Sequence, residues 1–304
     1  MIRIVFLFAL PQEYAYLKRL IGSWRLKTRK PFKSFVCSFA SNHRSLPVTT
    51  KHKNPPHPPL PNGEQHEDSS SCKGGQGGFH SKELILIETG MGQNRMVEAL
   101  AWLYEWTHPD LVVAAGFAGS LTQDLNVGDV CLGEAFTSLD FPSHSQSGPR
   151  INQSIPGGLM QFCTEHRIRR TRILTAGQPK LKQLLSKEFE DIPSIMDMES
   201  YFVARFCSRN HIPFLSLRAI SDGVSDEIDF DLTAISDDRG RVKIPLVLAS
   251  VLRNPRLIRS YYLSWKRSQI AAKGLGKVLF SFLNLPIVEI RTLGLENRLT
   301  MVLK

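Results

Sequence analysis

The chain has 304 residues, of which 42% are hydrophobic and 22% are charged. This composition is typical of a globular protein and excludes a fibrous or wholly disordered chain. The formal net charge is +10, and residues 253–304 hold ten Lys or Arg against two Glu. A basic tail on a nearly neutral body indicates a local surface property; without a recognition motif, it does not indicate nucleic-acid binding.

The sequence also bears on membranes and on the redox environment. No apolar run reaches the roughly 18 residues that a membrane span needs. The segment MIRIVFLFALPQEY predicts a buried strand and not a signal peptide, because its apolar run is short and lacks a small-residue cleavage site. The five cysteines are scattered, which favours reduced thiols in the cytoplasm over a disulfide framework.

Buried strands alternate with helices along most of the chain. Apolar runs predict strands at 1–10, 83–88, 110–115, 126–135, 173–176 and 213–221. Helical spacing predicts helices at 12–21, 94–107, 181–189, 198–210, 244–252 and 255–282. This alternation predicts an α/β fold with a largely parallel central sheet covered on both faces.

A Pro/Gly/Ser-rich segment interrupts this pattern. The run HKNPPHPPLPNG is followed by DSSSCKGGQGG, and no hydrophobic period survives from 51 to 78. We interpret residues from about 41 to 82 as a disordered insertion or a degraded pair of strands. The predicted organisation is therefore a domain at 1–252 with this insertion, and a basic helical C-terminal extension at 253–304.

Three predicted strands end in glycine-rich or polar turns. These turns are TGMG at 89–92, GFAGS at 116–120 and SDGVSD at 221–226. Ligands of open α/β sheets bind outside the carboxyl ends of the strands, and glycine lets the backbone approach a ligand closely. Three such turns in one chain predict a ligand site.

Acidic residues give a second signal. Asp197 and Glu199, in MDMES, lie at the entrance to a predicted helix, where a carboxylate also stabilises the helix N-terminus. Asp222 ends an apolar strand. We expect partial burial to raise the pKa of the Asp222 carboxyl and to suit it to proton donation.

These motifs resemble those of a known family. The order and spacing of LPQE, ETGMGQNRMVEAL, VVAAGFAGSL, MDMESYFVARFC and IPFLSLRAISDGVSDE resemble the nucleoside phosphorylase superfamily. Within it, they look most like the methylthioadenosine/S-adenosylhomocysteine nucleosidases. The resemblance implies a three-layer α/β/α sandwich with a mixed, largely parallel central sheet, and a homodimer.

The resemblance also implies roles for individual residues. Glu13 matches the carboxylate that orients the attacking water, and Thr89 and Arg218 match groups that help to hold that water. Asp222, helped by Ser221, matches the acid at purine N7. The remaining implied substrate-binding residues are Met198 under the sugar, Glu199 at the ribose hydroxyls, and the turn residues Gly90, Gly92, Gly116, Ala118 and Gly119.

Three departures from the family pattern bear on the reaction. The arginine with which the phosphorylases bind phosphate is replaced by Ala114, which favours water over phosphate unless Arg95 or Arg218 substitutes. The purine-stacking aromatic of the nucleosidases aligns with residues 178–180, Gln-Pro-Lys. The region of the family's second and third strands has become the Pro/Gly/Ser-rich segment.

The expected function is hydrolytic cleavage of the N-glycosidic bond of a 5′-substituted purine nucleoside. Two alternatives stay open. The C-terminal segment resembles the tail of the hopanoid-associated phosphorylases, which implies phosphorolysis of an adenosyl-lipid. The altered purine pocket leaves room for a catalytically silent nucleoside-binding protein.

No cofactor or metal is expected, since the histidines of the insertion lack metal-ligand spacing. The expected partner is a small-molecule nucleoside. Basic and aromatic residues interleave in the predicted helix at 255–282, which is the composition of a helix that lies on anionic lipid. This predicts peripheral contact with the inner face of a membrane; the alternative is a helix that packs on its own domain.

Overall fold

The computed structural model describes residues 1–40, 81–140, 150–177, 185, 193–226, 237, 243–254, 257–296 and 299–302. Nearly all of the predicted insertion lies outside these residues. So do residues 178–180 and almost all of the predicted helix at 181–189.

The elements alternate between strands and helices, as the sequence predicts. The strands are β1 (Ile2–Phe8), β2 (Arg25–Thr28), β3 (Lys33–Phe39), β4 (Lys82–Glu88), β5 (Leu111–Ser120), β6 (Val130–Ser138), β7 (Arg150–Gln153), β8 (Arg169–Thr175), β9 (Ser194–Asp197), β10 (Phe214–Asp222) and β11 (Leu299–Val302). The helices are α1 (Pro11–Ile21), α2 (Gln93–Trp106), α3 (Gly157–Glu165), α5 (Ser200–Arg209), α6 (Ile244–Arg253), α7 (Leu257–Leu283) and α8 (Ile287–Glu296).

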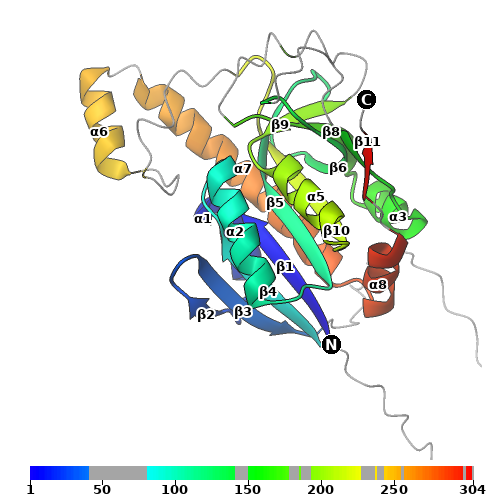
Figure 1. The fold of residues 1–304 in the computed structure, drawn as a ribbon. Coiled ribbons are helices and arrows are strands. Elements are labelled where there is room, and N and C mark those ends of the chain that lie inside the picture. The colour runs from blue at the N-terminus through cyan, green and yellow to red at the C-terminus, as the bar shows by residue number, and fades with distance from the viewer. Residues whose placement is uncertain are drawn as a thin grey trace, which may run out of the picture.

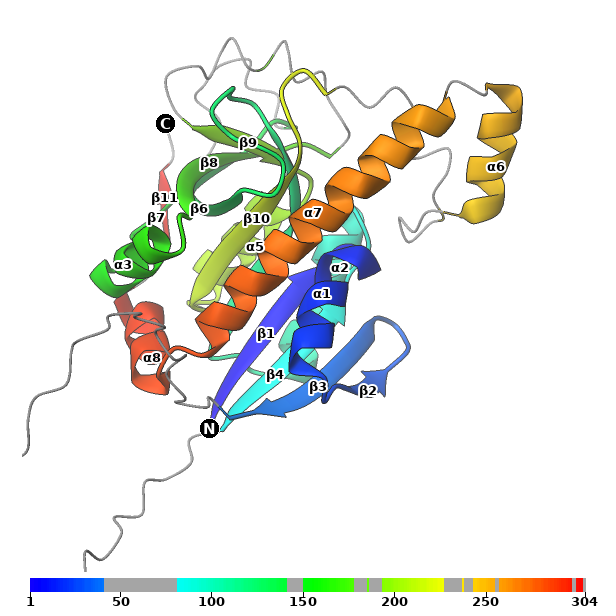
Figure 2. The same cartoon turned by 180° about the vertical axis from the view of Figure 1, so that it is seen from behind.

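The strands form one mixed sheet between two layers of helices. Its order is β11-β7-β6-β8-β9-β5-β1-β4-β3-β2, and β10 pairs with both β5 and β6. The central strands β4, β1, β5 and β10 run parallel, so their carboxyl ends share one edge. Helices α2 and α5 cover one face (Figure 1), and α1 and α7 cover the other (Figure 2). The predicted three-layer α/β/α sandwich is confirmed.

The sequence of β1 shows why this strand lies at the centre. It reads IRIVFLF, a nearly continuous apolar run of the kind found in strands that are covered on both faces. Successive side chains point to opposite faces. Ile4 and Phe6 therefore join the core beneath α1 and α7, whereas Val5 and Leu7 join the core beneath α2 and α5.

The second and third strands of the sheet are present, so the prediction that the Pro/Gly/Ser-rich segment replaced them is wrong. Strand β3 pairs antiparallel with β4 along its whole length, from Lys33 opposite Glu88 to Phe39 opposite Lys82, and β2 pairs with β3. The segment is therefore inserted between β3 and β4. Sequence patterning missed these strands because β2 is exposed at the sheet edge and β3 is only partly covered. Neither strand shows a continuous apolar run.

The C-terminal segment belongs to the same core as the rest of the chain. The second half of α7 buries Leu275, Leu279 and Phe282 in the core cluster that also contains β1 and α1. A Cβ on Gly276 would lie 2.7 Å from Tyr16 Cδ1, so α7 and α1 touch closely here. The predicted boundary at 252/253 therefore does not separate an independent extension.

Two further contacts join the end of the chain to the sheet. The buried Lys82 ammonium donates hydrogen bonds to the carbonyls of Leu283 and Leu285, where α7 ends. Strand β11 then pairs antiparallel with β7, so this segment is not purely helical as predicted. The contacts join positions about 150 to 200 residues apart, and local sequence patterns do not predict such pairings.

We expect Leu279→Ala to lower the free energy of unfolding by about 2–5 kcal/mol, because it leaves a cavity at a side chain with 0% exposure. Leu263→Ala, on the exposed part of the same helix, is the matched control and should change it by less than about 0.5 kcal/mol. Urea denaturation measures both. Equal effects would contradict the core role of this half of α7.

Candidate active site

The predicted site segments meet at the carboxyl edge of the central strands. Glu13 lies in the first turn of α1, just after β1, and residues 89–92 follow β4. Residues 116–120, predicted as a turn, are instead the last part of β5, since β5 continues to pair with β10 and β9 there. Asp222 ends β10, and Glu199 is the N-cap residue of α5.

Arg218 is the centre of this group. It comes from β10, and only 2% of its surface is exposed. Its Nη2 lies 2.8 Å from Asp197 Oδ2, and its Nη1 lies 3.6 Å from Glu199 Oε2. Its Nε donates a hydrogen bond of 3.1 Å to Ser200 Oγ. The guanidinium is therefore held by groups on both sides of the β9–α5 junction.

Glu13 reaches the same cluster from helix α1. Its Oε2 accepts a hydrogen bond of 2.9 Å from the Leu10 amide, and its Oε1 accepts one of 3.0 Å from the Phe117 amide. A Cβ on Gly116 would overlap the Arg218 guanidinium and lie 2.8 Å from Glu13 Oε1. Glycine at 116 thus lets both side chains lie against the backbone of β5.

Glu199 joins the cluster to the turn after β4. Its Oε1 accepts a hydrogen bond of 3.0 Å from the amide of Gly92, whose φ of +87° favours glycine. A Cβ on Gly92 would lie 4.0 Å from the Met198 methyl group. The predicted turn at 89–92 and the MDMES motif are therefore in direct contact.

The cluster holds three carboxylates around one guanidinium. Burial raises the pKa of Glu13, and the Arg218 charge opposes this rise. Burial also raises the pKa of Glu199 to about 7; Arg218 lowers it, and the neighbouring Asp197 charge raises it further. A carboxyl with a pKa near neutrality can both accept and release a proton at working pH.

Asp222 and Thr89 lie at the same carboxyl edge of the sheet. Asp222 is half-buried, and its Oδ1 accepts a hydrogen bond of 2.5 Å from Ser221 Oγ, which is the predicted pairing. The Thr89 hydroxyl is fully buried and lies within hydrogen-bonding distance of the carbonyls of Phe8 (3.1 Å) and Gly90 (3.0 Å). The Thr89 hydroxyl thus braces the turn, and its role toward a water molecule stays a prediction.

Sequence reasoning missed the groups that hold Arg218. Asp197 was noted only as an acid at a helix entrance, yet it accepts hydrogen bonds from Thr175 Oγ1 at 2.6 Å and from the Ser200 amide at 3.0 Å. The only sequence signal for this role of Asp197 was the pair of acidic residues in MDMES. The Phe117 amide could not have been found from side-chain types, because it is a backbone group.

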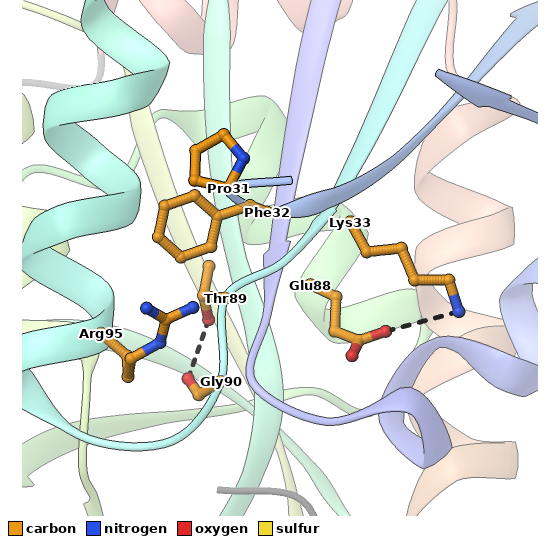
Figure 3. A pocket seen from close by; sticks show the side chains of 7 residues that line it. All are labelled: Pro31, Phe32, Lys33, Glu88, Thr89, Gly90 and Arg95. Carbon is orange, nitrogen blue, oxygen red and sulfur yellow. Dashed lines mark hydrogen bonds and ion pairs between the residues drawn. The ribbon is translucent and has the colours of Figure 1, made fainter. Parts of the chain in front are cut away.

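A small pocket adjoins the site through Thr89 and Gly90. Its other lining residues are Pro31, Phe32, Lys33, Glu88 and Arg95 (Figure 3). The Arg95 guanidinium lies over the Phe32 ring, 4.6 Å from its centre, and forms an ion pair of 2.6 Å with Glu98. Lys33 Nζ lies 3.9 Å from Glu88 Oε2. The basic groups of this pocket already face acidic partners.

Within the described part of the chain, no group of three or more His, Cys, Asp and Glu is arranged to hold a metal ion. Four of the cysteines, Cys37, Cys131, Cys163 and Cys207, are buried free thiols. Cys72 lies outside the described residues.

Comparisons with known proteins agree with this geometry. Residues 59–253 match the family model of the Phosphorylase superfamily. The 5′-methylthioadenosine/S-adenosylhomocysteine nucleosidase of Geobacillus sp. (strain WCH70) is 22% identical over 208 residues, covering 62% of this chain and 89% of that protein. The nucleosidase of the same name from Aeromonas salmonicida (strain A449) is 28% identical over 168 residues, covering 50% and 73%.

Solved structures show the same fold. The nucleosidase from Neisseria meningitidis, in complex with methylthio-immucillin-A, superposes with a TM-score of 0.59 at 14% identity, covering 96% of this chain and 100% of that one. The futalosine hydrolase of Helicobacter pylori superposes with a TM-score of 0.57 at 15% identity, covering 93% and 97%. The family match spans well over half of the chain, so this protein belongs to the phosphorylase superfamily.

The raised pKa of Glu199 predicts how stability depends on pH. A buried carboxyl of this kind stabilises the fold fully below its ordinary pKa of 4.5, and this contribution is lost as the pH rises through about 7. We expect the free energy of unfolding to fall by about 1–3 kcal/mol from pH 5 to pH 8 through this residue. Glu199→Gln should flatten the fall, as measured by urea denaturation at each pH.

The exposed Glu165 offers the matched control. Glu165→Gln should leave the pH dependence as it is in the wild type. If Glu199→Gln and wild-type protein show the same slope, Glu199 does not carry the buried proton.

Proposed function

We propose that the protein cleaves the N-glycosidic bond of a purine nucleoside with water as the acceptor. The observation that carries the proposal is that Glu13 and Glu199 are buried beside the same guanidinium, that of Arg218, at the edge where Asp222 ends β10. Membership of the superfamily supports it, as do relatives that are named nucleosidases.

The reaction needs opposite charges stabilised at two places. As the bond breaks, positive charge develops on the ribosyl ring and negative charge on the departing base. In our proposal, Asp222 donates a proton at N7 of the base, and Ser221 orients the Asp222 carboxyl through its hydrogen bond. Such general-acid assistance typically contributes about 10²–10⁴-fold in rate.

The other two carboxyls act on the sugar side. Glu199, fixed by the Gly92 amide, accepts hydrogen bonds from the ribose hydroxyls and places negative charge beside the ring. Met198, partly exposed beside Gly92, packs under the sugar. Glu13 orients the attacking water and takes its proton, and the raised pKa that burial gives Glu13 makes it a better base.

The charge balance of the site favours water over phosphate. Ala114, at the position expected for a phosphate-binding arginine, is fully buried in β5. Arg218 is already held by Asp197, Glu199 and Ser200, and Arg95 pairs with Glu98. A phosphate dianion beside this excess of carboxylates would be poorly compensated, and burying a charge without a partner is costly.

We also propose that the protein acts as a homodimer, as its resemblance to the nucleosidases implies. The outer side of α2 offers a surface for this contact. Val97 and Tyr104, one heptad apart, are 48% and 51% exposed there. Trp102 and Trp106 stack on the same helix with ring centres 4.5 Å apart. Light scattering of the full chain measures its mass in solution.

Asp222→Asn tests the proton donor, because it keeps the shape of the side chain and removes the acid. We expect kcat for release of adenine from 5′-methylthioadenosine to fall at least about 100-fold with KM little changed, since the group acts in the transition state. Asp124→Asn, at a half-exposed carboxylate that pairs with Arg169, is the control and should keep wild-type turnover. Wild-type turnover in Asp222→Asn would rule out this role.

The sugar product tests the nucleophile. In buffer with abundant inorganic phosphate, we expect free ribose or its 5′-substituted form, because the site compensates a phosphate poorly. Phosphorus NMR of the reaction mixture detects any sugar 1-phosphate. A sugar phosphate as the main product would support phosphorolysis instead. Binding of a panel of 5′-substituted adenosines without any cleavage would identify a silent nucleoside-binding protein.

A further inference from the structure

One side of the first half of α7 is apolar and yet faces outward. The helix runs past the body of the protein toward α6 (Figures 1 and 2). Ile258, Tyr262 and Trp265 are spaced four and three residues apart, which puts them on one side of the helix. They are 62%, 58% and 60% exposed. The second half of the same helix, by contrast, buries its apolar side chains in the core.

A second row of side chains runs beside the first. It consists of Arg259, Leu263, Lys266 and Ile270, which are spaced four, three and four residues apart and are all exposed. We call the two rows together the outer face of α7; its seven residues are Ile258, Arg259, Tyr262, Leu263, Trp265, Lys266 and Ile270. A helix with aromatic and aliphatic side chains beside basic ones has the composition of interfacial helices on lipid.

The charged residues of α6, α7 and the segment between them are all basic. Residues 244–283 contain seven Lys or Arg and no Asp or Glu. Two copies of this face would bring positive charges together, so charge complementarity disfavours a second copy of the chain as its partner. An anionic surface complements the face, and Tyr and Trp are the residues that settle at the headgroup level of a bilayer.

The outer face is held in a fixed relation to the candidate active site. Arg267 forms an ion pair of 2.7 Å with Asp226 Oδ1, and Asp226 Oδ2 accepts a hydrogen bond of 3.0 Å from the Gly223 amide. Gly223 directly follows Asp222. Ile270 lies against Gly128, where a Cβ would come within 2.8 Å of its Cγ2. These contacts hold α7 beside the loop after Asp222, and Ile270 forms the edge of the outer face that meets the body.

We propose that the outer face of α7 docks the protein onto the surface of an anionic lipid bilayer. The apolar row enters the headgroup region, and the basic row contacts the lipid phosphates. The helix lies on the surface, since no helix in the described part of the chain has both the length and the apolarity to cross a bilayer. The loop after Asp222 is held to the same half of α7 by the ion pair between Asp226 and Arg267.

Vesicle flotation of the full chain tests the proposal. We expect binding to vesicles of phosphatidylcholine with phosphatidylglycerol at low salt, little binding to phosphatidylcholine alone, and weaker binding as salt is added. Arg259→Glu with Lys266→Glu should lower the partition coefficient at least about tenfold. The triple change Ile258→Ser, Tyr262→Ser and Trp265→Ser should remove binding. All of these side chains are exposed, and thermal melts check that the variants fold.

A matched control separates this face from the net charge of the whole protein. Arg25→Glu with Lys27→Glu makes the same change of charge on the exposed strand β2, and it should leave binding near the wild-type level. The emission of Trp265, taken as the difference between wild-type protein and Trp265→Phe, should shift to the blue when anionic vesicles are added.

Three results would overturn the proposal. The first is no binding to anionic vesicles, or equal binding to neutral ones. The second is an equal loss of binding in the α7 and β2 charge variants, which would show general attraction by the net charge. The third is burial of Trp265 without lipid, together with a doubling of mass that the triple serine variant abolishes; a second copy would then cover this face. None of these readouts depends on nucleoside cleavage, so the two proposals fail separately.

Discussion

The burial of the Arg218 guanidinium is the constraint on which the site depends. A guanidinium with 2% exposure has lost its hydration, so the fold must supply partners for it. Asp197 and Ser200 supply them from the β9–α5 junction, and Thr175 in turn holds Asp197 from β8. Removing one member of a buried ion pair leaves an uncompensated charge, which is typically more destabilising than the net gain from the pair. The cluster therefore fixes the positions of β8, β9, α5 and β10 relative to one another.

The same cluster determines the acid–base properties of Glu13 and Glu199 at the carboxyl edge of the sheet. One guanidinium cannot compensate three buried carboxylates, and the pKa values of Glu13 and Glu199 rise as a result of burial. Asp197 holds Arg218 most closely, and the backbone amides of Gly92 and Phe117 bind Glu199 and Glu13, which in the proposed reaction act on the sugar and the water. Gly116 makes the arrangement sterically possible, because any side chain there would overlap Arg218. A glycine that reads as a turn residue in the sequence is thus a point of close approach within a strand.

Helix α7 has 27 residues, and its two halves lie in different environments. Its second half is covered by α1 and β10 and completes one layer of the sandwich. Its first half extends beyond the sheet, where the Arg267–Asp226 ion pair, the contact of Ile270 with Gly128 and the hydrogen bond between Tyr261 and Ser250 hold it in place. The arrangement places an exposed apolar and basic face next to the loop that follows the proposed proton donor, Asp222. Helix α7 would then connect the proposed membrane-binding surface to the proposed active site.

The sequence by itself determined the central parallel strands, because β1, β4, β5 and β10 are covered on both faces and their apolar runs are local signals. It also placed Glu13, Glu199, Arg218 and Asp222 in motifs next to these strands. Tertiary structure alone decided that β2 and β3 complete the sheet, that α7 and β11 join the same core, and that Asp197 holds Arg218. Edge strands carry weak patterns. Pairings between distant segments leave no periodic pattern in the sequence. A residue such as Asp197 is charged because of its partner Arg218, which is 21 residues away in the chain and in contact only in the folded structure.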